Sequence, residues 1–355
     1  VVTPNLLVGG AEKVSVSLAN EASKNLEGEV LLLALNGAGK LKKGLVQETT
    51  FIDLKSASSL LLLVRLFVFL LFNRGPIISC QRTSNVYVGL CNIFLFRRRL
   101  IFREASTLTS LAQDSFFIRN LKIFTMWLSY KGCTHVVANS EDTKSDLLKY
   151  SIASCCKCSV IGNPVIPRNI NELREKCISH KWLSGNFKVI LSVGRLEPVK
   201  DFLSIIEAMK KLIDMDKGYR LIIIGDGELR GSLINQVNDL GISEFVDFIH
   251  FSDNVFAYMN KADVYVSTSL WEGFGNTIVE AMACGLPVVG FDCPGGARQL
   301  ILDDSASKLI MNRSVNELVS GINSIVNINA SRDENLNALK YRVDIIFNRY
   351  YELID

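Results

Sequence analysis

A chain of 355 residues, 48% of them hydrophobic and 21% charged, is long enough for two domains of ordinary size, each with its own core. The formal net charge of +3 is too small for a nucleic-acid-binding protein, which usually concentrates more basic residues on one face. The composition therefore excludes nucleic acid as a partner and indicates a soluble globular protein.

The nine cysteines are scattered, and a chain of this length does not need disulfides to fold. Cys155, Cys156 and Cys158 form a tight cluster, but the CxxC pairs and matching histidines of zinc sites are absent. We therefore expect reduced thiols in a reducing compartment and neither a metal nor another cofactor. The chain begins at Val1 without a signal-peptide pattern, and we expect its first strand to be cut short.

In the first half of the chain, apolar runs alternate with helical patterns, which predicts a parallel sheet covered by helices on both faces. Strands are predicted at Glu29–Leu35, Thr50–Leu54, Pro76–Cys80, Arg99–Glu104, Thr134–Asn139 and Cys158–Ile161. Helices are predicted at Gly9–Lys24, Asn85–Phe96, Ile118–Lys131 and Asp142–Tyr150.

One further helix in this half is unusually apolar. Residues 58–73 read SSLLLLVRLFVFLLFN, with Arg65 near the middle. A membrane span needs about 20 apolar residues, and a central arginine costs about 3 kcal/mol there. The sequence favours a core helix, keeps a helix that partly faces a membrane surface as the alternative, and gives least support to a span.

The stretch Asn163–Pro167 contains two prolines and predicts an extended connector, after which the alternation begins again at Phe187. Strands are predicted at Phe187–Leu196, Arg220–Glu228, Val246–Phe251, Ala262–Ser267 and Pro287–Phe291. Helices are predicted at Asp201–Asp214 with Asp201 as N-cap, and at Leu229–Leu240, Val255–Met259, Val315–Ile328 and Asn335–Tyr351. The expected domains are 1–170 and 171–335, with a C-terminal helix at 336–355 packing back toward the first domain.

The residues from Ala262 to Ile301 carry the most chemistry. Glu272 and Glu280, separated by seven residues, bracket a junction between a loop and a helix. Gly273 and Gly275 leave backbone N–H groups uncovered where the helix begins, which favours an anion. A carboxylate there repels the anion unless it binds another group, such as sugar hydroxyls. The pattern therefore indicates a nucleotide-sugar.

Two other motifs bear on this site. Gly225 and Gly227 follow a strand, but Arg230 stands where a dinucleotide fingerprint requires glycine or alanine, so no nicotinamide site is predicted. Arg195 and Lys200 flank a proline-containing turn at a strand's carboxyl end. A guanidinium and an ammonium in such a place can neutralise a diphosphate.

The segment from Glu272 to Glu280 resembles the E-x7-E motif of the family-4 retaining glycosyltransferases, which have the GT-B fold. That fold is an α/β arrangement of two Rossmann-like, doubly wound domains facing each other across a cleft. Supporting matches follow the family's order at Gly9–Glu12, Arg103–Glu104, Val137–Ser140, Asn163–Pro164, Val193–Lys200, Gly225–Glu228 and Pro294–Ile301. A nucleotide-sugar epimerase of the same fold and a non-catalytic sugar-nucleotide-binding protein remain as alternatives.

The resemblance implies a role for each matching residue. Arg195 and Lys200 are expected to bind the donor diphosphate, and Glu280 the ribose. Glu272 is expected to bind the hydroxyls of the donor sugar. Glu272, Arg195 and Lys200 together form the expected catalytic set. Further donor contacts are expected from Gly9, Gly10, Gly227, Gly273, Phe274, Gly275, Asn276 and Thr277. Arg103 and Glu104 are expected on the acceptor side.

The implied activity is metal-independent transfer, with retention, of a hexose or N-acetylhexosamine. The expected donor is a UDP-sugar, and the expected acceptor a saccharide or lipid-linked saccharide in cell-surface polysaccharide synthesis. The expected location is cytoplasmic. The apolar helix and the run Arg97–Arg99 further predict peripheral contact with an anionic membrane.

The chain departs from the family pattern at two positions. His250 stands where the family often has glycine, which affects the expected base contacts, and Gln299 stands where it often has glutamate. Many members also carry a first-domain histidine on the catalytic side, and none of the three histidines here matches it.

Overall fold

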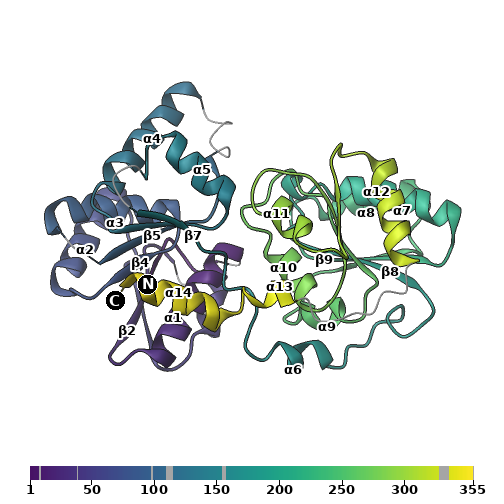
Figure 1. Cartoon of the computed structure of the whole chain (residues 1–355), viewed down its shortest axis with the longest axis horizontal. Helices are drawn as coiled ribbons and strands as arrows, with labels where there is room; N and C mark the ends of the chain where they lie inside the picture. Colours follow the sequence, from purple (N-terminus) through teal and green to yellow (C-terminus); the bar gives the residue numbers. More distant parts are fainter. Residues whose placement is uncertain are drawn as a thin grey trace. The chain divides into compact units, whose positions relative to one another are not determined.

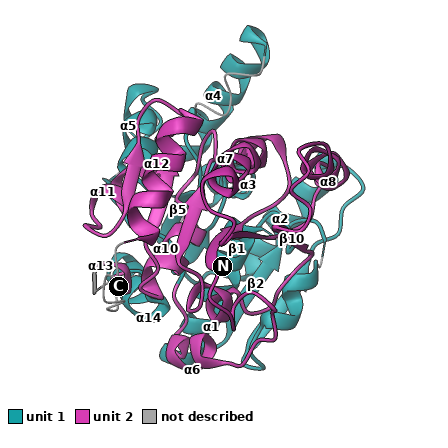
Figure 2. Cartoon of the chain, turned by 90° about the vertical axis from the view of Figure 1, so that its right-hand side faces the viewer, with its two compact units in different colours: residues 1–165, 341–355 teal, residues 166–340 magenta. Residues whose placement is uncertain are grey.

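The computed structural model describes residues 1–7, 9–37, 39–96, 99–108, 115–153, 157–327 and 336–354. The chain forms two compact units, which we call unit 1 (residues 1–165 and 341–355) and unit 2 (residues 166–340) (Figure 2). The chain passes between the units twice, near the boundaries expected at 170 and 335. Its C-terminal segment belongs to unit 1.

Unit 1 contains a parallel sheet with the strand order β3-β2-β1-β4-β5-β6-β7 (Figure 1). The strands within the described ranges are β1 (Val2–Thr3), β2 (Val30–Ala34), β3 (Thr49–Asp53), β4 (Ile77–Ser79), β5 (Leu100–Glu104), β6 (His135–Ala138) and β7 (Lys157–Val160). The chain builds outward from β1 to β3 and then returns to place β4 beside β1. This reversal makes β1 and β4 the topological switch point.

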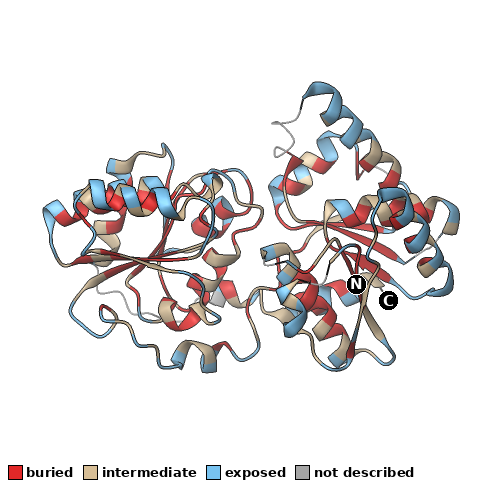
Figure 3. Ribbon diagram, turned by 180° about the vertical axis from the view of Figure 1, so that it is seen from behind, coloured by how far each residue is buried: buried red, intermediate tan, exposed pale blue. Residues whose placement is uncertain are grey.

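The middle strands of unit 1 are buried on both faces, as their continuous apolar runs predict. All residues of β5 and β6 are buried, and Figure 3 shows the strands in the buried colour between partly exposed helices. The helices of the unit are α1 (Gly10–Asn25), the 3-10 turn η1 (Lys40–Gly44), α2 (Ser59–Phe72), α3 (Arg82–Leu95), α4 (Phe116–Tyr130), α5 (Glu141–Lys149) and α14 (Val343–Ile354). Helix α14 packs on α1, where Ile346 and Phe347 share a buried cluster with Val14 and Leu18.

The apolar helix α2 is neither wholly buried nor long enough to cross a bilayer. Leu62, Leu66 and Leu70 face the core, and most of the remaining side chains are exposed. Across the part of the chain that the structure describes, no helix is both long and apolar enough for a membrane span. The prediction of a core helix holds for one face of α2 only.

Unit 2 contains a second parallel sheet, with the order β10-β9-β8-β11-β12-β13. Its strands are β8 (Lys188–Val193), β9 (Tyr219–Ile224), β10 (Val246–Ile249), β11 (Val264–Ser267), β12 (Val288–Phe291) and β13 (Lys308–Ile310). Here the reversal lies between β8 and β11. The prediction of two doubly wound parallel sheets is confirmed.

The helices of unit 2 cover both faces of this sheet (Figure 1). They are α6 (Ile170–Glu175), the 3-10 turn η3 (Pro198–Lys200), α7 (Phe202–Met215), α8 (Arg230–Asp239), α9 (Val255–Met259), α10 (Asn276–Ala283), α11 (Ala297–Leu302), α12 (Val315–Val326) and α13 (Leu336–Leu339). In α7 the apolar side chains repeat at helical spacing, and seven of its residues are buried in the unit 2 core.

The structure differs from the sequence-based predictions in three respects. The predicted helix Asn335–Tyr351 is two helices, α13 and α14, because the chain passes from unit 2 to unit 1 between them. Helices α6 and α11 and strand β13 were not predicted. Asp201 precedes α7 but makes no capping hydrogen bond, since its carboxylate binds Arg313 instead.

Candidate functional site

The best-defined group of polar side chains in unit 2 lies at its switch point. Lys200 is in the connection that follows β8, and Glu272 is in the connection that follows β11, the strand paired with β8. The two connections leave the sheet in opposite directions, which opens a crevice at the carboxyl ends of the strands. Ligands of doubly wound sheets bind in this place.

Lys200 and Glu272 contact each other directly. Lys200 Nζ lies 2.5 Å from Glu272 Oε1, and Ser269 Oγ donates to the same oxygen at 2.6 Å. No described residue donates to Oε2. The Glu272 side chain is 12% exposed and that of Lys200 is 22% exposed. One carboxylate oxygen is therefore held in place by the protein, and the other remains available to a hydroxyl donor.

Arg195 lies on the same connection as Lys200 but points toward solvent. Its side chain is 66% exposed, and Nη1 pairs with Glu197 Oε1 at 2.7 Å. The Lys200 side chain runs beside Gly194, where an added Cβ would lie 3.4 Å from Lys200 Cε. The proline-containing turn predicted between the two cations is the 3-10 turn η3.

A glycine-dependent contact fixes the backbone of Glu272. Glu272 N–H donates to the Pro294 carbonyl oxygen, and Glu272 forms an isolated parallel bridge with Gly295. Gly295 has a φ of +113°, and a Cβ there would lie 1.5 Å from the Glu272 carbonyl oxygen. Only glycine permits this approach.

Helix α10 begins immediately beyond this point. Gly275 is its N-cap in the left-handed conformation, with a φ of +97°. The first residues of the helix, Asn276 and Thr277, are partly exposed, whereas Phe274 is buried. A helix start carries uncovered N–H groups and the positive end of the helix dipole, both of which favour an anion. Glu280 lies one turn further along the helix and is partly exposed.

Two buried side chains, Tyr265 and Cys293, belong to this part of the site. The Tyr265 hydroxyl donates to Thr277 Oγ1 at 2.7 Å, and burial raises the pKa of Tyr265. Burial, together with the Glu272 carboxylate, raises the pKa of the Cys293 thiol to about 12. Cys293 therefore remains protonated near neutral pH and does not act as a nucleophile there.

Arg313 is a residue that the sequence reading missed. Its guanidinium binds the Asp201 carboxylate at 2.6 Å and the carbonyl oxygens of Thr268 and Ser269 at 2.8 Å each. It therefore joins the connection after β8 to the connection after β11, and holds Lys200 near Glu272. No motif signals this role, because Arg313 is 112 residues from Asp201 in the sequence.

Gly225 and Gly227 pack against the connection that carries Arg195. A Cβ on Gly225 would lie 1.8 Å from the Gly194 carbonyl oxygen, and one on Gly227 would lie 2.5 Å from that of Leu196. This confirms a tight turn at these glycines. The Gly227 N–H lowers the pKa of Asp226, whose carboxylate lies 3.5 Å from His250 Nδ1.

The remaining candidates belong to unit 1. Gly9 is the N-cap of α1 and Gly10 its first residue, and α1 is the helix between the switch-point strand β1 and β2. Arg103 and Glu104, expected on the acceptor side, are the last residues of β5, and both are fully buried. In this structure neither side chain has a surface that an acceptor could contact.

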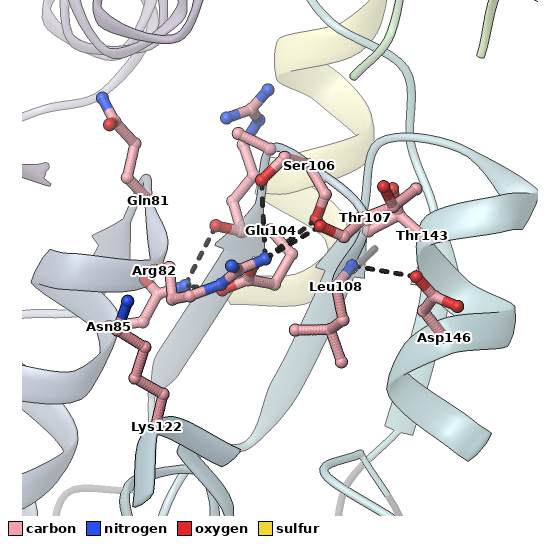
Figure 4. A network of polar contacts seen from close by, with 12 residues as sticks. Gln81, Arg82, Asn85, Glu104, Ser106, Thr107, Leu108, Lys122, Thr143 and Asp146 are labelled. Carbon is pink, nitrogen blue, oxygen red and sulfur yellow. Dashed lines mark hydrogen bonds and ion pairs between the residues drawn. The ribbon is translucent and has the colours of Figure 1, made fainter. Parts of the chain in front are cut away.

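Glu104 is enclosed by a polar network (Figure 4). Its Oε1 accepts hydrogen bonds from the Tyr130 hydroxyl and from Asn85 Nδ2, the latter at 3.0 Å, and its Oε2 lies 3.4 Å from Arg82 Nε. Arg82 also donates to the carbonyl oxygens of Ser106 and Thr107. Burial and the Glu104 carboxylate raise the pKa of Tyr130 well above its usual value.

Arg103 points to other parts of the same unit. Its Nη2 donates to Asn163 Oδ1 at 2.5 Å, close to the point where the chain leaves unit 1. Its positive charge also acts on the Tyr350 phenol of α14 and lowers its pKa, although burial raises that pKa more strongly. Arg103 therefore connects β5 with both segments of unit 1 that lead to or from unit 2.

Among the residues that the structure describes, no three His, Cys, Asp or Glu side chains lie close enough together to hold a metal ion. The described cysteines are free thiols. Cys155 and Cys156 of the sequence cluster, and Arg97 and Arg98 of the basic run, lie outside the described residues.

The chain is similar to known glycosyltransferases. Residues 176–342 match the family model described as "Glycosyl transferases group 1". A Campylobacter jejuni protein named N-acetylgalactosamine-N,N'-diacetylbacillosaminyl-diphospho-undecaprenol 4-alpha-N-acetylgalactosaminyltransferase is 28% identical over 72% of this chain and 68% of its own length. An Escherichia coli protein named UDP-Gal:alpha-D-GlcNAc-diphosphoundecaprenol alpha-1,3-galactosyltransferase is 28% identical over 68% of this chain and 63% of its own.

The fold has close counterparts among solved structures. The crystal structure of Anabaena HepE in complex with UDP and glucose superimposes with a TM-score of 0.79. It covers 99% of this chain and 98% of HepE at 20% sequence identity. At this identity the likeness concerns the fold alone.

Proposed function

We propose a donor and an acceptor class for this chain, which belongs to the group 1 (GT4) glycosyltransferases and has the GT-B fold. The donor is a UDP-linked hexose or N-acetylhexosamine. The acceptor is a saccharide or lipid-linked saccharide used in bacterial cell-surface polysaccharide synthesis. The names of the C. jejuni and E. coli relatives, both of which include a diphospho-undecaprenol group, support the acceptor, and the UDP in HepE supports the donor.

The observation that carries this proposal is the half-satisfied carboxylate of Glu272. Lys200 and Ser269 both donate to Oε1, and Oε2 has no protein donor among the described residues. A sugar hydroxyl is the donor that completes such a carboxylate. Lys200 offsets the negative charge of Glu272, which would otherwise repel a nearby diphosphate.

The proposed roles follow from these positions. Glu272 binds donor-sugar hydroxyls, and Lys200 and Arg195 bind the diphosphate. The backbone N–H groups from Gly273 to Thr277 add hydrogen bonds at the positive end of α10. Glu280 accepts hydrogen bonds from the ribose. Gly9, Gly10, Phe274 and Gly227 provide close backbone approach in their own units.

These groups also account for the chemistry. Breaking the bond between sugar and phosphate leaves negative charge on UDP and positive charge on the sugar ring. Cations fixed beside the leaving group and a carboxylate fixed beside the ring stabilise both charges as they develop. The proposed outcome at the anomeric carbon is retention. On the acceptor side, the buried Glu104 and Arg103 act as positioning residues. Glu104 holds the Arg82 side chain in place, and Arg103 holds the Asn163 side chain in place.

The proposed location is cytoplasmic. The free thiols of the described cysteines support a reducing compartment.

A thermal-shift screen with UDP, GDP, ADP and their sugars tests the donor. We expect the largest stabilisation with UDP-sugars, and Arg195→Ala and Lys200→Met should each weaken UDP binding about tenfold or more, because a charged hydrogen bond is lost. Glu207→Gln, on the exposed side of α7, is the matched control. Equal stabilisation of wild type and the Arg195 and Lys200 variants by every nucleotide would contradict the donor site.

Turnover tests the activity. NMR of the stabilising UDP-sugar, with and without a polyprenyl-diphosphate saccharide, separates three outcomes. We expect a glycosidic product only with the acceptor and with the donor's anomeric configuration retained. Conversion of the sugar without acceptor would identify an epimerase, and nucleotide binding without any turnover would identify a binding protein.

A further inference from the structure

Arg313 and Asp201, which bind each other beside the donor site, both have a backbone conformation that residues other than glycine rarely adopt. Arg313 has a φ of +48° and Asp201 a φ of +47°. Aspartate tolerates this left-handed region better than most residues, whereas arginine has no such advantage. A strained conformation persists only where surrounding contacts hold it, and strained residues gather at binding and catalytic sites. The contacts of the Arg313 side chain hold this one.

The Arg313 side chain follows β13 and reaches the connections after β8 and β11. Its Nη2 donates to Asp201 Oδ2 at 2.6 Å and to the Thr268 carbonyl oxygen at 2.8 Å. Its Nη1 donates to the Ser269 carbonyl oxygen at 2.8 Å. The guanidinium also lies over the Phe291 ring, 4.7 Å from the ring centroid. Because a guanidinium is planar and presents its N–H groups in fixed directions, these bonds define the spacing between the two connections.

The residues that Arg313 binds are next to the two charged side chains assigned to the donor. Asp201 directly follows Lys200 in the chain. Ser269 Oγ donates to Glu272 Oε1 at 2.6 Å. Arg313 therefore acts on the cation through one bond and on the carboxylate through another.

Other hydrogen bonds join the same two connections. Thr268 Oγ1 donates to the carbonyl oxygens of Lys200 and Asp201, at 3.0 and 2.8 Å, and the Leu270 N–H donates to the Val199 carbonyl oxygen at 2.8 Å. These bonds run directly between the two connections. Arg313 differs from them because it comes from a third connection, the one that follows β13.

The buried Cys293 thiol shows that the charged groups lie close together. Burial raises the pKa of this thiol most, the Glu272 carboxylate raises it further, and the Arg313 and Lys200 cations lower it. All three charges therefore act at one point in the site.

The spacing of Lys200 and Glu272 matters more for sugar transfer than for nucleotide binding. Lys200 is proposed to bind the diphosphate and Glu272 the sugar, so the two groups stabilise opposite charges as the bond between them breaks. Both must be in place at that moment. UDP without a sugar uses the cation and the start of α10, and it does not need Glu272.

We propose that Arg313 is a positioning residue for sugar transfer, which sets the spacing of Lys200 and Glu272 by holding together the connections that carry them. The proposal rests on the donor roles proposed above for those two side chains. Arg313 itself touches neither the diphosphate nor the sugar. When its guanidinium is lost, the two connections shift relative to each other.

Kinetics and calorimetry of Arg313→Met test the proposal. The probes are UDP, UDP-hexoses and UDP-N-acetylhexosamines, and the measured step is release of UDP to a polyprenyl-diphosphate saccharide or to water. We expect kcat to fall about 10²-fold, the loss that a misplacement of about 1 Å causes. The dissociation constant of UDP should rise less than about threefold, because Lys200 and the N–H groups at the start of α10 still bind the phosphates.

Two further substitutions separate the guanidinium from the fold. Arg313→Lys keeps one nitrogen that can bond both Asp201 and the Thr268 carbonyl oxygen, so it should recover about tenfold of the lost kcat. Arg313→Gly removes the side chain together with the backbone strain, since glycine adopts a positive φ freely. This variant should unfold at close to the wild-type temperature and still have the low kcat, and it replaces Arg313→Met if that variant folds poorly.

A double variant tests whether Arg313 acts through Glu272. In the Glu272→Gln background the charge that Arg313 positions is already absent. Adding Arg313→Met should therefore lower kcat less than about fivefold further, well below the loss in the wild-type background.

Lys188→Met is the matched control. Lys188 pairs with Asp216 at 2.8 Å and is 32% exposed, against 31% for Arg313. It is the first residue of β8, whereas Lys200 follows the last residue of that strand. The substitution removes an ion pair of similar exposure from the other end of the sheet, and it should leave kcat and UDP binding unchanged.

The outcomes separate this proposal from the donor site. Unchanged kcat in Arg313→Met, or equal losses of kcat and UDP affinity, would overturn the positioning role while the donor site stands. A loss in the Glu272→Gln background as large as in the wild type would overturn it as well. Wild-type protein that binds no UDP would overturn the donor site, and this proposal with it.

Discussion

Glu104 is the last residue of a buried parallel strand in unit 1, Glu272 follows such a strand in unit 2, and each is paired with a cation. Glu104 is 1% exposed, and both of its oxygens have protein donors. Glu272 is 12% exposed, and its two donors share one oxygen. We infer from this difference that Glu104 serves the fold, whereas the unused oxygen of Glu272 is available to a ligand.

Topology accounts for this difference. Glu272 follows β11, one of the two switch-point strands of its sheet, so the adjacent connections diverge and leave a crevice. Glu104 ends β5, which lies between β4 and β6, and helices α3 and α4 supply the donors Asn85 and Tyr130 that cover it. A glutamate at the carboxyl end of the unit 2 sheet is therefore partly exposed, whereas one at the carboxyl end of the unit 1 sheet is enclosed by packed side chains.

The largest expected effect concerns the buried glutamate. Glu104→Ala should lower the free energy of unfolding by about 3–5 kcal/mol, because Arg82, Asn85 and Tyr130 lose their common acceptor in the core. Chemical denaturation measures this, with Glu141→Ala at an exposed helix position as the control. A loss below about 1 kcal/mol would mean that the network does not support the fold.

Glu272→Gln tests the opposite half of the comparison. We expect kcat/KM to fall about 10²–10³-fold, about 3–4 kcal/mol in transition-state stabilisation, because the amide carries no charge to place beside the sugar. Stability should change little, as only one partly exposed ion pair is lost. A variant that unfolds early but retains kcat/KM would assign Glu272 a structural role like that of Glu104.

Gly295→Ala sharpens the comparison by moving the backbone that carries Glu272. The added Cβ would meet the Glu272 carbonyl oxygen, and the positive φ is unfavourable for alanine. We expect a loss of about 1–3 kcal/mol in unfolding free energy together with reduced UDP-sugar binding. Gly231→Ala in α8, where a Cβ meets nothing within 4 Å, should be neutral or stabilising by up to about 1 kcal/mol. Similar behaviour of the two variants would contradict this account.

An effect of similar size on stability alone is expected at the phenol that donates to Glu104. Tyr130→Phe removes a hydrogen bond to a carboxylate and should cost about 1.5–3 kcal/mol near neutral pH. Tyr219→Phe, whose hydroxyl donates to the neutral Asn323 side chain, is the matched control and should cost about 0.5–1.5 kcal/mol.

The pH dependence of Tyr130→Phe has a definite sign. The pKa of Tyr130 is raised in the folded state, so its contribution is complete below the ordinary tyrosine pKa of about 10. As the pH rises above about 10, the unfolded phenol loses its proton while the folded one keeps it, and wild-type stability falls. Denaturation at pH 9 and pH 11 should show the gap between wild type and variant narrowing. A constant gap would contradict the buried, neutral phenol.

Much of the fold was predictable because its signals are local. Apolar runs such as Val30–Ala34 and Tyr219–Ile224 are buried on both faces of a parallel sheet, and alternation with helices gives the doubly wound class. The glycines at 225 and 227 correctly indicated a tight turn, since their need for close backbone approach is a property of the residue itself. The sequence could not show which face of α2 is buried, because the segment is apolar on all sides.

The sequence by itself determined that two α/β units exist and that Glu272, Glu280, Arg195 and Lys200 are the residues to consider. Only the tertiary structure decided how they act. Lys200 and Glu272 are 72 residues apart in the sequence and meet because β8 and β11 are neighbouring strands. Arg313, which is 112 residues from Asp201 in the sequence, binds the same two connections. Burial removed Arg103 and Glu104 from direct contact with solvent. Strand order and packing set these pairings, and no local pattern encodes them.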